Sequence, residues 1–412
     1  MIDPVVVVGG GQVAVQLCLA LRKDKHNGPI IVFSEESQAP YHRPPLSKAY
    51  ITGKVDSTTL PMRPDSFYLA KDIELRLNEK VTAINPADKT ISTQTGVQRY
   101  SNLVLATGAL ARPFSIDGSA LDNVFQLRDM HDARCIKACL EKSRSIAVIG
   151  AGFIGLEAAA AINQLGKKVT VFDTADRVMG RAVAPLISHW FEKTHRSAGI
   201  DIHLNESINR VVEDNNGKVA GVERADGSVV TAQMVLVGIG VLPASDLAAA
   251  AGIDCDNGVV VDEYCRSSDA NVFAAGDCAN HSNKYAPGRR IRLESIQNAT
   301  DQARVVARAI AQPENAAPYQ AVPWFWSDQA DHSLQMTGLS FDADNHVLRG
   351  DPDSGSFSVF HYKGEKLLSV DSVNSSRDHM VARKLLAAGV SPSVTQAADP
   401  DVNLMELARS AR

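Results

Sequence analysis

Val5-Val-Val-Val-Gly9-Gly-Gly11-Gln-Val-Ala14 and Ile146-Ala-Val-Ile-Gly150-Ala-Gly152-Phe-Ile-Gly155 share one pattern. In each copy a short apolar run is followed by a glycine-rich turn, and the turn opens into a helical pattern. This is the context that the dinucleotide-binding fingerprint requires. We therefore expect an α/β fold with two dinucleotide-binding units in one chain.

The spacing of the small residues gives each one a physical role. The first and third positions, Gly9 and Ala14 or Gly150 and Gly155, allow a tight turn and close packing of helix on strand. The middle position lets the backbone approach a pyrophosphate, which the N–H groups at the helix N-terminus then bind. The middle residues are Gly11 and Gly152.

An acidic residue follows the second predicted strand of each unit. Glu35 comes after residues 30–33, and Asp173 comes after residues 168–172. A carboxylate at this position accepts hydrogen bonds from ribose hydroxyl groups. Asp173 would also repel a 2′-phosphate, which favours NADH over NADPH, although Arg177 and Arg181 lie close by and leave the preference open.

Composition limits the class of protein. The chain has 412 residues, of which 45% are hydrophobic and 22% charged, and its net charge is −5. This length predicts two or three domains, and an acidic balance disfavours nucleic-acid binding. No apolar stretch reaches the length of a membrane span, and the N-terminus lacks the basic region of a signal peptide. We expect a cytoplasmic protein without a membrane partner.

The cysteines predict neither a metal site nor structural disulfides, because none forms a C-x-x-C pair. Most are expected to be small buried side chains. Two of them, Cys135 and Cys139, lie at i and i+4 on a predicted helix, and no cysteine lies between Cys18 and Cys135. The six are Cys18, Cys135, Cys139, Cys255, Cys265 and Cys278.

Other segments give coarser expectations. Residues 40–48 contain three prolines and predict a fixed extended loop that enters a helix near Ser47. Residues 80–107 predict short antiparallel strands. From about residue 321 the pattern changes to alternating strands and a helix near 378–388, which predicts a separate α+β domain. Residues 394–400 are expected to form a loop.

Two further signals, Thr107-Gly108 and Gly276-Asp277, resemble accessory signatures of FAD-containing reductases. The resemblance implies a glutathione-reductase-like flavoprotein with a split FAD domain, into which an NAD domain is inserted, and a C-terminal α+β domain. In those families the aspartate, here Asp277, binds the ribityl chain of the flavin. The expected boundaries are 1–112 and 241–320 for the FAD domain, 113–240 for the NAD domain and 321–412 for the C-terminal domain.

Cysteine positions separate the families that share this plan. Disulfide reductases carry a redox cysteine pair near the first fingerprint or a C-x-x-C in the NAD domain, and peroxide-reducing relatives carry one cysteine near position 42. This chain has Tyr41-His42-Arg43 there. A thiol relay between flavin and substrate is therefore not expected, and a thiol- or peroxide-reducing enzyme is the weaker alternative.

Four longer motifs closely resemble the NADH-dependent ferredoxin reductases of the putidaredoxin reductase type, which serve bacterial haem-thiolate monooxygenases and aromatic-ring dioxygenases. Three residues depart from the usual pattern: His42, Leu242 and Ala330. The motifs are Pro40-Tyr41…Arg43-Pro44-Pro45-Leu46-Ser47-Lys48, Gly150-Ala-Gly-Phe-Ile-Gly-Leu-Glu157, Arg292-Leu-Glu294-Ser-Ile-Gln-Asn298-Ala and Pro323-Trp-Phe-Trp-Ser-Asp-Gln329.

The resemblance assigns roles to individual residues. Lys48 is expected beside the flavin N5, paired with Glu157, which would also bind the nicotinamide amide; these two are the predicted catalytic residues. Arg43 and the prolines would shape the loop over the FAD pyrophosphate. The predicted cofactor-binding residues are Gly9, Gly11, Ala14, Glu35, Arg43, Pro45, Lys48, Thr107, Gly108, Arg112, Asp277, Ile296, Trp324, Gly150, Gly152, Gly155, Asp173, Arg181 and Gly240.

The implied activity is NADH:ferredoxin oxidoreduction. Hydride from NADH would reduce FAD, and single electrons would pass to a small iron–sulfur ferredoxin, of the 2Fe–2S type, that feeds a haem-thiolate monooxygenase. The alternatives are a dioxygenase reductase component, a rubredoxin reductase and an apoptosis-inducing-factor-like protein. Because ferredoxins are acidic, a basic docking patch is expected. Its candidates are Arg63, Lys284, Arg289, Arg290, Arg304 and Arg308, with Trp326 as an aromatic contact.

Overall fold

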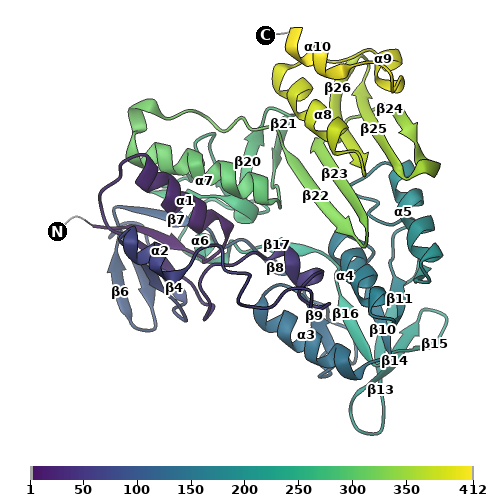
Figure 1. The fold of residues 1–412 in the computed structure, drawn as a ribbon. Coiled ribbons are helices and arrows are strands. Elements are labelled where there is room, and N and C mark those ends of the chain that lie inside the picture. The colour runs from purple at the N-terminus through teal and green to yellow at the C-terminus, as the bar shows by residue number, and fades with distance from the viewer. Residues whose placement is uncertain (1–2, 411–412) are drawn as a thin grey trace. The chain divides into compact units, whose positions relative to one another are not determined.

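The computed structural model describes residues 3–410 (Figure 1). By its internal contacts the chain divides into two compact units. Unit 1 consists of the chain up to His42, Pro61–Leu110 and Leu242–Phe325. Unit 2 consists of Arg43–Leu60, Ala111–Val241 and the chain from Trp326 onward. Residues 1, 2, 411 and 412, which the expected first and last domains include, lie outside the described residues.

A five-stranded parallel sheet forms the centre of unit 1. Its strand order is β19-β7-β1-β2-β3. All four residues of β1 are buried, as is usual for a parallel sheet covered on both faces. The strands are β19 (Val272–Ala274), β7 (Asn102–Leu105), β1 (Val5–Val8), β2 (Ile30–Phe33) and β3 (Ile73–Arg76).

Helices α1 (Gln12–Lys23) and α7 (Ile296–Ala311) lie side by side in unit 1 (Figure 1). Alternation along β1 decides what they cover: Val5 and Val7 belong to the core formed with these helices, whereas Val6 belongs to the core on the other face. The glycine-rich turn after β1 leads directly into α1, as the fingerprint predicts.

The remaining elements of unit 1 are short. The expectation of antiparallel strands over residues 80–107 is correct for β4, β5 and β6 but wrong for β7, which is a parallel strand of the central sheet because Leu103–Leu105 are buried on both sides. These elements are α2 (Asp65–Ala70), β4 (Val81–Asn85), β5 (Thr90–Thr93), β6 (Gly96–Arg99), α6 (Asp246–Ala250), β18 (Val259–Val261), β20 (Ala279–Asn283), β21 (Ala286–Ile291) and 3₁₀ turns at Gly276–Cys278 and Pro313–Asn315.

Unit 2 contains the second parallel sheet, in the order β12-β11-β10-β16-β9. The strands are β12 (Asp201–His203), β11 (Lys168–Phe172), β10 (Ser145–Ile149), β16 (Met234–Val237) and β9 (Val124–Gln126); the helices around them are α3 (Met130–Lys142), α4 (Phe153–Gln164) and α5 (Pro185–Ser197). A three-stranded antiparallel sheet of β13 (Ile208–Glu213), β14 (Val219–Arg224) and β15 (Val229–Thr231) follows.

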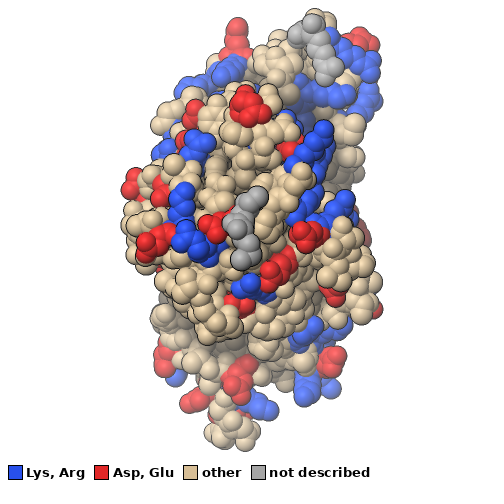
Figure 2. All heavy atoms as spheres, turned by 90° about the vertical axis from the view of Figure 1, so that its left-hand side faces the viewer, with Lys and Arg blue, Asp and Glu red and all other residues tan. Residues whose placement is uncertain are grey.

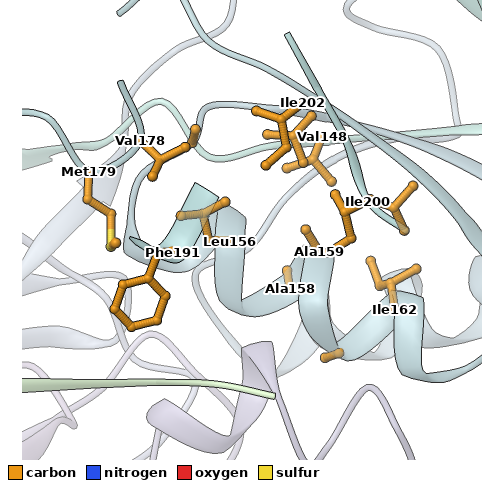
Figure 3. Packing of buried hydrophobic residues seen from close by; sticks show 14 of the residues in the cluster. Val148, Leu156, Ala158, Ala159, Ile162, Val178, Met179, Phe191, Ile200 and Ile202 are labelled. Atoms are coloured by element: carbon orange, nitrogen blue, oxygen red, sulfur yellow. The ribbon is translucent and has the colours of Figure 1, made fainter. Parts of the chain in front are cut away.

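Helix α4 is apolar on nearly all sides, and every residue from Gly155 to Ile162 is buried. Such a helix belongs in the interior of a domain. Figure 3 shows Leu156, Ala159 and Ile162 packed among side chains from the sheet and from α5, including Val148 and Phe191. The small residues of α4 let it lie close to β10, which carries the second fingerprint.

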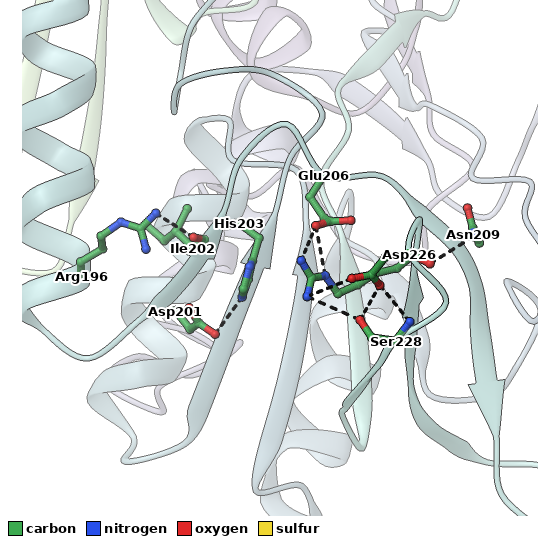
Figure 4. A network of polar contacts seen from close by, with 9 residues as sticks. Arg196, Asp201, Ile202, His203, Glu206, Asn209, Asp226 and Ser228 are labelled. Carbon is green, nitrogen blue, oxygen red and sulfur yellow. Dashed lines mark hydrogen bonds and ion pairs between the residues drawn. The ribbon is translucent and has the colours of Figure 1, made fainter.

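A polar network holds the end of this sheet to the antiparallel strands (Figure 4). The Arg224 guanidinium pairs with Glu206 at 2.6 Å, and Ser228 is bound by Asp226. Nearby, Arg196 donates to the carbonyl oxygen of Ile202 at 2.7 Å. The Arg224 and Glu206 side chains are half-buried, and their pair fixes the local geometry between β14 and the segment that follows β12.

The C-terminal part of unit 2 is an antiparallel sheet in the order β22-β23-β26-β25-β24. It shares one core with the parallel sheet: the Trp190 indole donates to the Pro352 carbonyl oxygen at 2.9 Å and contacts the Phe357 ring. The elements are β22 (Trp324–Gln329), β23 (His332–Gly338), β24 (Asn345–Asp351), a 3₁₀ turn at Pro352–Ser354, β25 (Ser356–Lys363), β26 (Lys366–Val373), α8 (Ser376–Ala388), α9 (Val394–Ala398) and α10 (Leu404–Ser410).

One local expectation in this region is wrong, and one unusual residue has a structural explanation. The loop expected over residues 394–400 is wrong, because Val394–Ala398 form α9. A capping box, in which Ser393 and Gln396 exchange side-chain and backbone hydrogen bonds, starts this helix. Ala330 adopts a left-handed conformation (φ 53°) in the turn between β22 and β23, where glycine is favoured.

Two of the points where the chain passes from one unit to the other lie within short strands. β8 (Ala109–Ala111) and β17 (Val241–Pro243) pair with each other. The helix expected near Ser47 is a single 3₁₀ turn, Pro44–Ser47.

Within residues 3–410, no helix is long and apolar enough to cross a membrane. The three-domain division stays a prediction.

We expect Gly155→Ala to lower the free energy of unfolding by about 1–3 kcal/mol or more. A Cβ at this position would lie 2.0 Å from the backbone oxygen of Gly150, which no side-chain rotation can relieve. Gly152→Ala in the same turn is the matched control, because its Cβ would meet nothing within 4 Å. Its expected change is under about 1 kcal/mol. Equal losses in urea unfolding would contradict this assignment of the two glycines.

Candidate functional site

The two glycine-rich turns have the same geometry. Gly9 (φ +116°) and Gly150 (φ +107°) each face a backbone carbonyl oxygen, so that a Cβ would lie 2.2 Å from that of Ala106 or 2.4 Å from that of Gly238. At both positions only glycine fits. The structure therefore gives these two residues the tight-turn role that the sequence predicts.

The middle glycines are different, because nothing lies within 4 Å of a Cβ built on Gly11 or Gly152. They are the N-caps of α1 and α4, and among the described residues no side chain caps either helix. Open space in front of uncapped N–H groups suits a bound phosphate. The two turns therefore fit dinucleotides. Ala14, in the third position of the first turn, is buried.

The strand-end acids have different surroundings. Glu35 is exposed and pairs with Lys80 at 2.9 Å. The Asp173 carboxylate accepts hydrogen bonds from the Ala151 and Ala175 backbone N–H groups at 2.6 and 2.8 Å. Asp173 therefore holds the second glycine turn to the end of β11. Ribose binding by Asp173 stays a prediction.

The two arginines near Asp173 do not behave alike. Arg177 donates inward, to the Val183 carbonyl oxygen and the Ser188 hydroxyl group. The Arg181 guanidinium instead lies 3.7 Å from the position that a Cβ on Gly240 would take. Only Arg181 remains a candidate to approach a nucleotide.

Several predicted cofactor residues of unit 1 lie where strands end. The Thr107 hydroxyl donates to the Ala244 carbonyl oxygen at 2.6 Å, and Gly108 has a positive φ of 70°. Asp277 lies in the 3₁₀ turn after β19, and its carbonyl oxygen accepts from Arg292 at 3.1 Å. Ile296 is the first residue of α7.

Buried polar atoms without a partner lie near these residues. The side-chain oxygens of Gln12 and Asn298 and the Nε of Arg292 have no hydrogen-bond partner among the described residues. Buried groups of this kind are rare in proteins and indicate a missing polar ligand or water. Gln12 was not among the predicted cofactor-binding residues, although its position directly after Gly11, at the start of α1, could have indicated it.

The predicted catalytic residues, Lys48 and Glu157, meet in unit 2. The Lys48 Nζ lies 3.0 Å from Glu157 Oε1, and it also approaches Asp328 Oδ2 at 3.4 Å. Two hydroxyl groups for which no role was predicted complete the cluster: Ser327 donates to Oε1 at 2.7 Å and Ser47 to Oε2 at 2.8 Å. Three donors thus converge on one carboxyl group.

Each segment of this cluster is placed by its own local structure. Glu157 lies on the buried helix α4 and is only 7% exposed. The 3₁₀ turn Pro44–Ser47 ends at Lys48, whose backbone N–H donates to Pro45. Strand β22 supplies Ser327. Burial raises the pKa of Glu157, while the Lys48 charge and the two hydroxyl groups oppose that rise.

Other predicted cofactor residues have structural partners. Arg43 donates to the Arg128 carbonyl oxygen at 3.0 Å, and the Arg112 backbone N–H donates to Gly240 at 2.9 Å. The Trp324 backbone N–H donates to the Gln297 side chain at 3.1 Å. Cofactor contacts of these residues stay predictions.

Three of the predicted partner residues already contact other side chains, and two of these three also line a groove. Arg308 binds Asp24 at 2.8 Å, Arg304 binds Asp301 at 2.8 Å, and Arg63 lies over the Phe67 ring. Arg304 and Arg308 line a groove of about 680 Å³ together with Arg22, Lys23, Lys71 and Asp24. On the face shown in Figure 2, basic and acidic side chains are interspersed.

All six cysteines are free thiols. Cys18, Cys265 and Cys278 are buried, and Cys135, Cys139 and Cys255 are half-buried, so fewer are buried than expected. Burial raises the pKa of the Cys18 thiol to about 12 and also raises that of Cys278. Thiols with raised pKa values are poor nucleophiles at neutral pH.

The raised pKa of Glu157 predicts a pH-dependent stability. The folded chain holds the Glu157 proton more tightly than the unfolded chain, whose pKa is near 4.5. The free energy of unfolding should therefore fall as the pH rises from 4.5 to the folded pKa, at up to about 1.4 kcal/mol per pH unit. Urea unfolding of Glu157→Gln should lack this component, whereas the exposed-site control Glu365→Gln should keep it. A component that persists in Glu157→Gln would refute the assignment.

Comparison with known proteins places this geometry in a family. Residues 3–303 match the family described as pyridine nucleotide-disulphide oxidoreductase, and residues 324–408 match the reductase C-terminal family. A ferredoxin reductase subunit of 5,5'-dehydrodivanillate O-demethylase from Sphingobium is 40% identical over 97% of this chain and 97% of its own.

Two solved structures are similar over nearly the whole chain. The ferredoxin reductase for the CYP199A2 system from Rhodopseudomonas palustris has a TM-score of 0.95, with 38% identity, 98% of this chain and all of its own covered. Putidaredoxin reductase in its covalent complex with putidaredoxin has a TM-score of 0.95, with 36% identity and 99% of both chains covered. This chain therefore belongs to the pyridine nucleotide-disulphide oxidoreductase family, and within that family to the ferredoxin reductases.

Proposed function

We propose that this chain is an FAD-dependent NADH:ferredoxin oxidoreductase. The Lys48–Glu157 pair carries the proposal, because it joins the proline-rich segment to the helix that follows the second fingerprint. The family match implies a flavin and NAD(H) as cofactors; the proposal adds that the flavin is FAD, that NADH is preferred and that the acceptor is a 2Fe–2S ferredoxin. We also propose the domain boundaries predicted from the sequence, which are 1–112 and 241–320 for the FAD domain, 113–240 for the NAD domain and 321–412 for the C-terminal domain.

The residues have distinct roles in this proposal. Gly9 and Gly11 would let the FAD pyrophosphate approach the N-terminal N–H groups of α1. Gly150 and Gly152 would do the same for the NADH pyrophosphate at α4. When bound, the flavin supplies the chemistry that takes up a hydride and releases electrons singly.

Lys48 would hold a positive charge beside the flavin, where it would stabilise negative charge on the reduced ring, and Glu157 would keep that ammonium in position. Because the buried cysteines are poor nucleophiles, no thiol step is proposed.

The acceptor is inferred from charge. Five basic side chains and one acidic side chain line the groove beside α1 and α7 in unit 1. An acidic protein would be attracted there, and such attraction mainly raises the association rate. Putidaredoxin bound to its reductase in the solved complex is a precedent for a protein acceptor. Arg304 and Arg308 are paired with Asp301 and Asp24, but the groove keeps a net positive charge because Arg22, Lys23 and Lys71 also line it. We therefore propose this groove as part of the docking surface.

Anaerobic addition of NADH to the flavin-loaded protein should bleach its flavin absorbance, and a 2Fe–2S ferredoxin should then be reduced. Rising salt should slow the second step because it screens the docking charges. Iodoacetamide treatment should leave both steps unchanged. Protein that stays oxidised would refute the proposal.

Faster reduction of a rubredoxin would change the acceptor, and thiol-sensitive turnover with disulfide or peroxide would favour the thiol-dependent alternative. Slow reduction by NADH without efficient transfer to any acceptor would favour a role like that of apoptosis-inducing factor.

Nucleotide preference should depend on the charge of Asp173. Asp173→Asn keeps one acceptor oxygen for the glycine turn but removes the charge that would repel a 2′-phosphate. The ratio of kcat/KM for NADH over that for NADPH should fall about tenfold, which equals about 1.4 kcal/mol. The exposed Asp176→Asn makes the same charge change three residues away and should leave the ratio near wild type. An unchanged ratio in Asp173→Asn would exclude Asp173 from nucleotide selection.

A further inference from the structure

A continuous chain of buried polar groups runs from Glu157 to a histidine on another helix. Ser327 donates to Glu157 Oε1 at 2.7 Å, Gln329 Nε2 lies 3.2 Å from Ser327 Oγ, and His195 Nε2 lies 2.7 Å from Gln329 Oε1. Ser327 and Gln329 are fully buried, and His195 is 3% exposed. All four residues belong to unit 2, and they come from α4, β22 and α5.

The hydrogen bonds have one consistent direction. An ionised Glu157 only accepts, so Ser327 must donate its single proton to it. The Ser327 oxygen then accepts from the Gln329 amide nitrogen, whose second hydrogen points to Met179 Sδ at 3.3 Å. The Gln329 oxygen is left to accept from His195, which therefore carries its proton on Nε2.

The reversed amide would break this pattern. It would turn the Gln329 oxygen toward Ser327 and Met179 Sδ, two acceptors in this network. It would also leave the amide nitrogen facing His195 Nε2. Every dipole in the observed direction points its positive end at Glu157, so the chain favours the charged carboxylate.

We propose that Gln329 and His195 are positioning residues that orient the Ser327 hydroxyl group and hold Glu157 as a carboxylate against Lys48. This inference rests on the proposed function, because it gives the Lys48–Glu157 pair a supporting chain of hydrogen bonds. A buried carboxylate beside a lysine keeps the lysine in place only while it is ionised, so the chain would widen the pH range in which the pair exists.

The surrounding charges leave room for this effect. Lys48 and, through Lys48, Asp328 are the charged groups recorded at the Glu157 end within residues 3–410. At the other end burial lowers the pKa of His195, with a smaller lowering from His332, while the Gln329 hydrogen bond opposes both. His195 is therefore neutral at physiological pH. Its protonation would add a hydrogen at Nδ1 and leave the Nε2 bond intact.

The test measures ionisation directly, in the full-length flavin-loaded protein. Infrared spectra recorded against pH follow the carboxyl band that disappears in Glu157→Gln. Gln329→Leu removes the amide but keeps the side-chain size, and we expect it to raise the pKa of Glu157 by about 0.5–1. His195→Leu should raise it by less, and His195→Gln, which still offers an N–H donor, should restore the wild-type value. Ser358→Ala, which alters a buried hydroxyl group on β25 outside the chain, is the matched control.

A second readout needs no variant. The ¹⁵N chemical shifts of the His195 ring in the wild-type protein should show the Nε2–H tautomer. The Nδ1–H tautomer would overturn the proposal, even if the variants fail to fold. An unmoved Glu157 pKa in Gln329→Leu, or an equal shift in Ser358→Ala, would also overturn it. If NADH does not reduce the wild-type protein, the proposed function fails, but both spectroscopic readouts still decide whether the chain of hydrogen bonds exists.

Discussion

The buried carboxyl group of Glu157 is the constraint that organises unit 2. An unpaired charge in a protein interior costs several kcal/mol, so its neighbours must supply donors. Those donors come from two distant segments: Ser47 and Lys48 from the proline-rich segment, and Ser327 from β22. These contacts tie the proline-rich segment to unit 2, with which residues 43–60 group instead of with the strands that flank them in sequence.

Backbone geometry explains which parts of the fold the sequence could predict. The first glycine of each turn has a positive φ and faces a carbonyl oxygen, so that only glycine fits there. Such a position is occupied by glycine in the sequence and can therefore be predicted. The buried strands and α4 were equally readable from their apolar runs. Strand β7 was harder, because a short apolar run does not say whether its neighbours are parallel. Helix α9 was missed, although Ser393 and Gln396 form a capping box that could have revealed it.

The candidate site was predictable only where a motif carried it. Lys48 and Glu157 were assigned roles by resemblance. Ser47, Ser327 and Gln329 lie in the same motifs and His195 lies outside them, but no role was predicted for any of the four, because their roles depend on three-dimensional contacts. The same limit applies to charge. Arg308 is recognisable as basic in the sequence, yet its partner Asp24, which directly follows α1, lies 284 residues earlier in the chain. No local pattern shows which charges are neutralised by such pairs.

The order of segments in unit 1 has a consequence during synthesis. Strand β7 is complete by Leu105, but its neighbour β19 and the helix α7 that covers α1 emerge only after the whole parallel sheet of unit 2 has been translated. At about 5–20 residues per second the ribosome takes on the order of ten seconds or more to reach them. For that time the nascent chain exposes an unpaired edge and the apolar face of α1. Chaperones that bind such surfaces would therefore matter more for the yield of this protein than for its final stability.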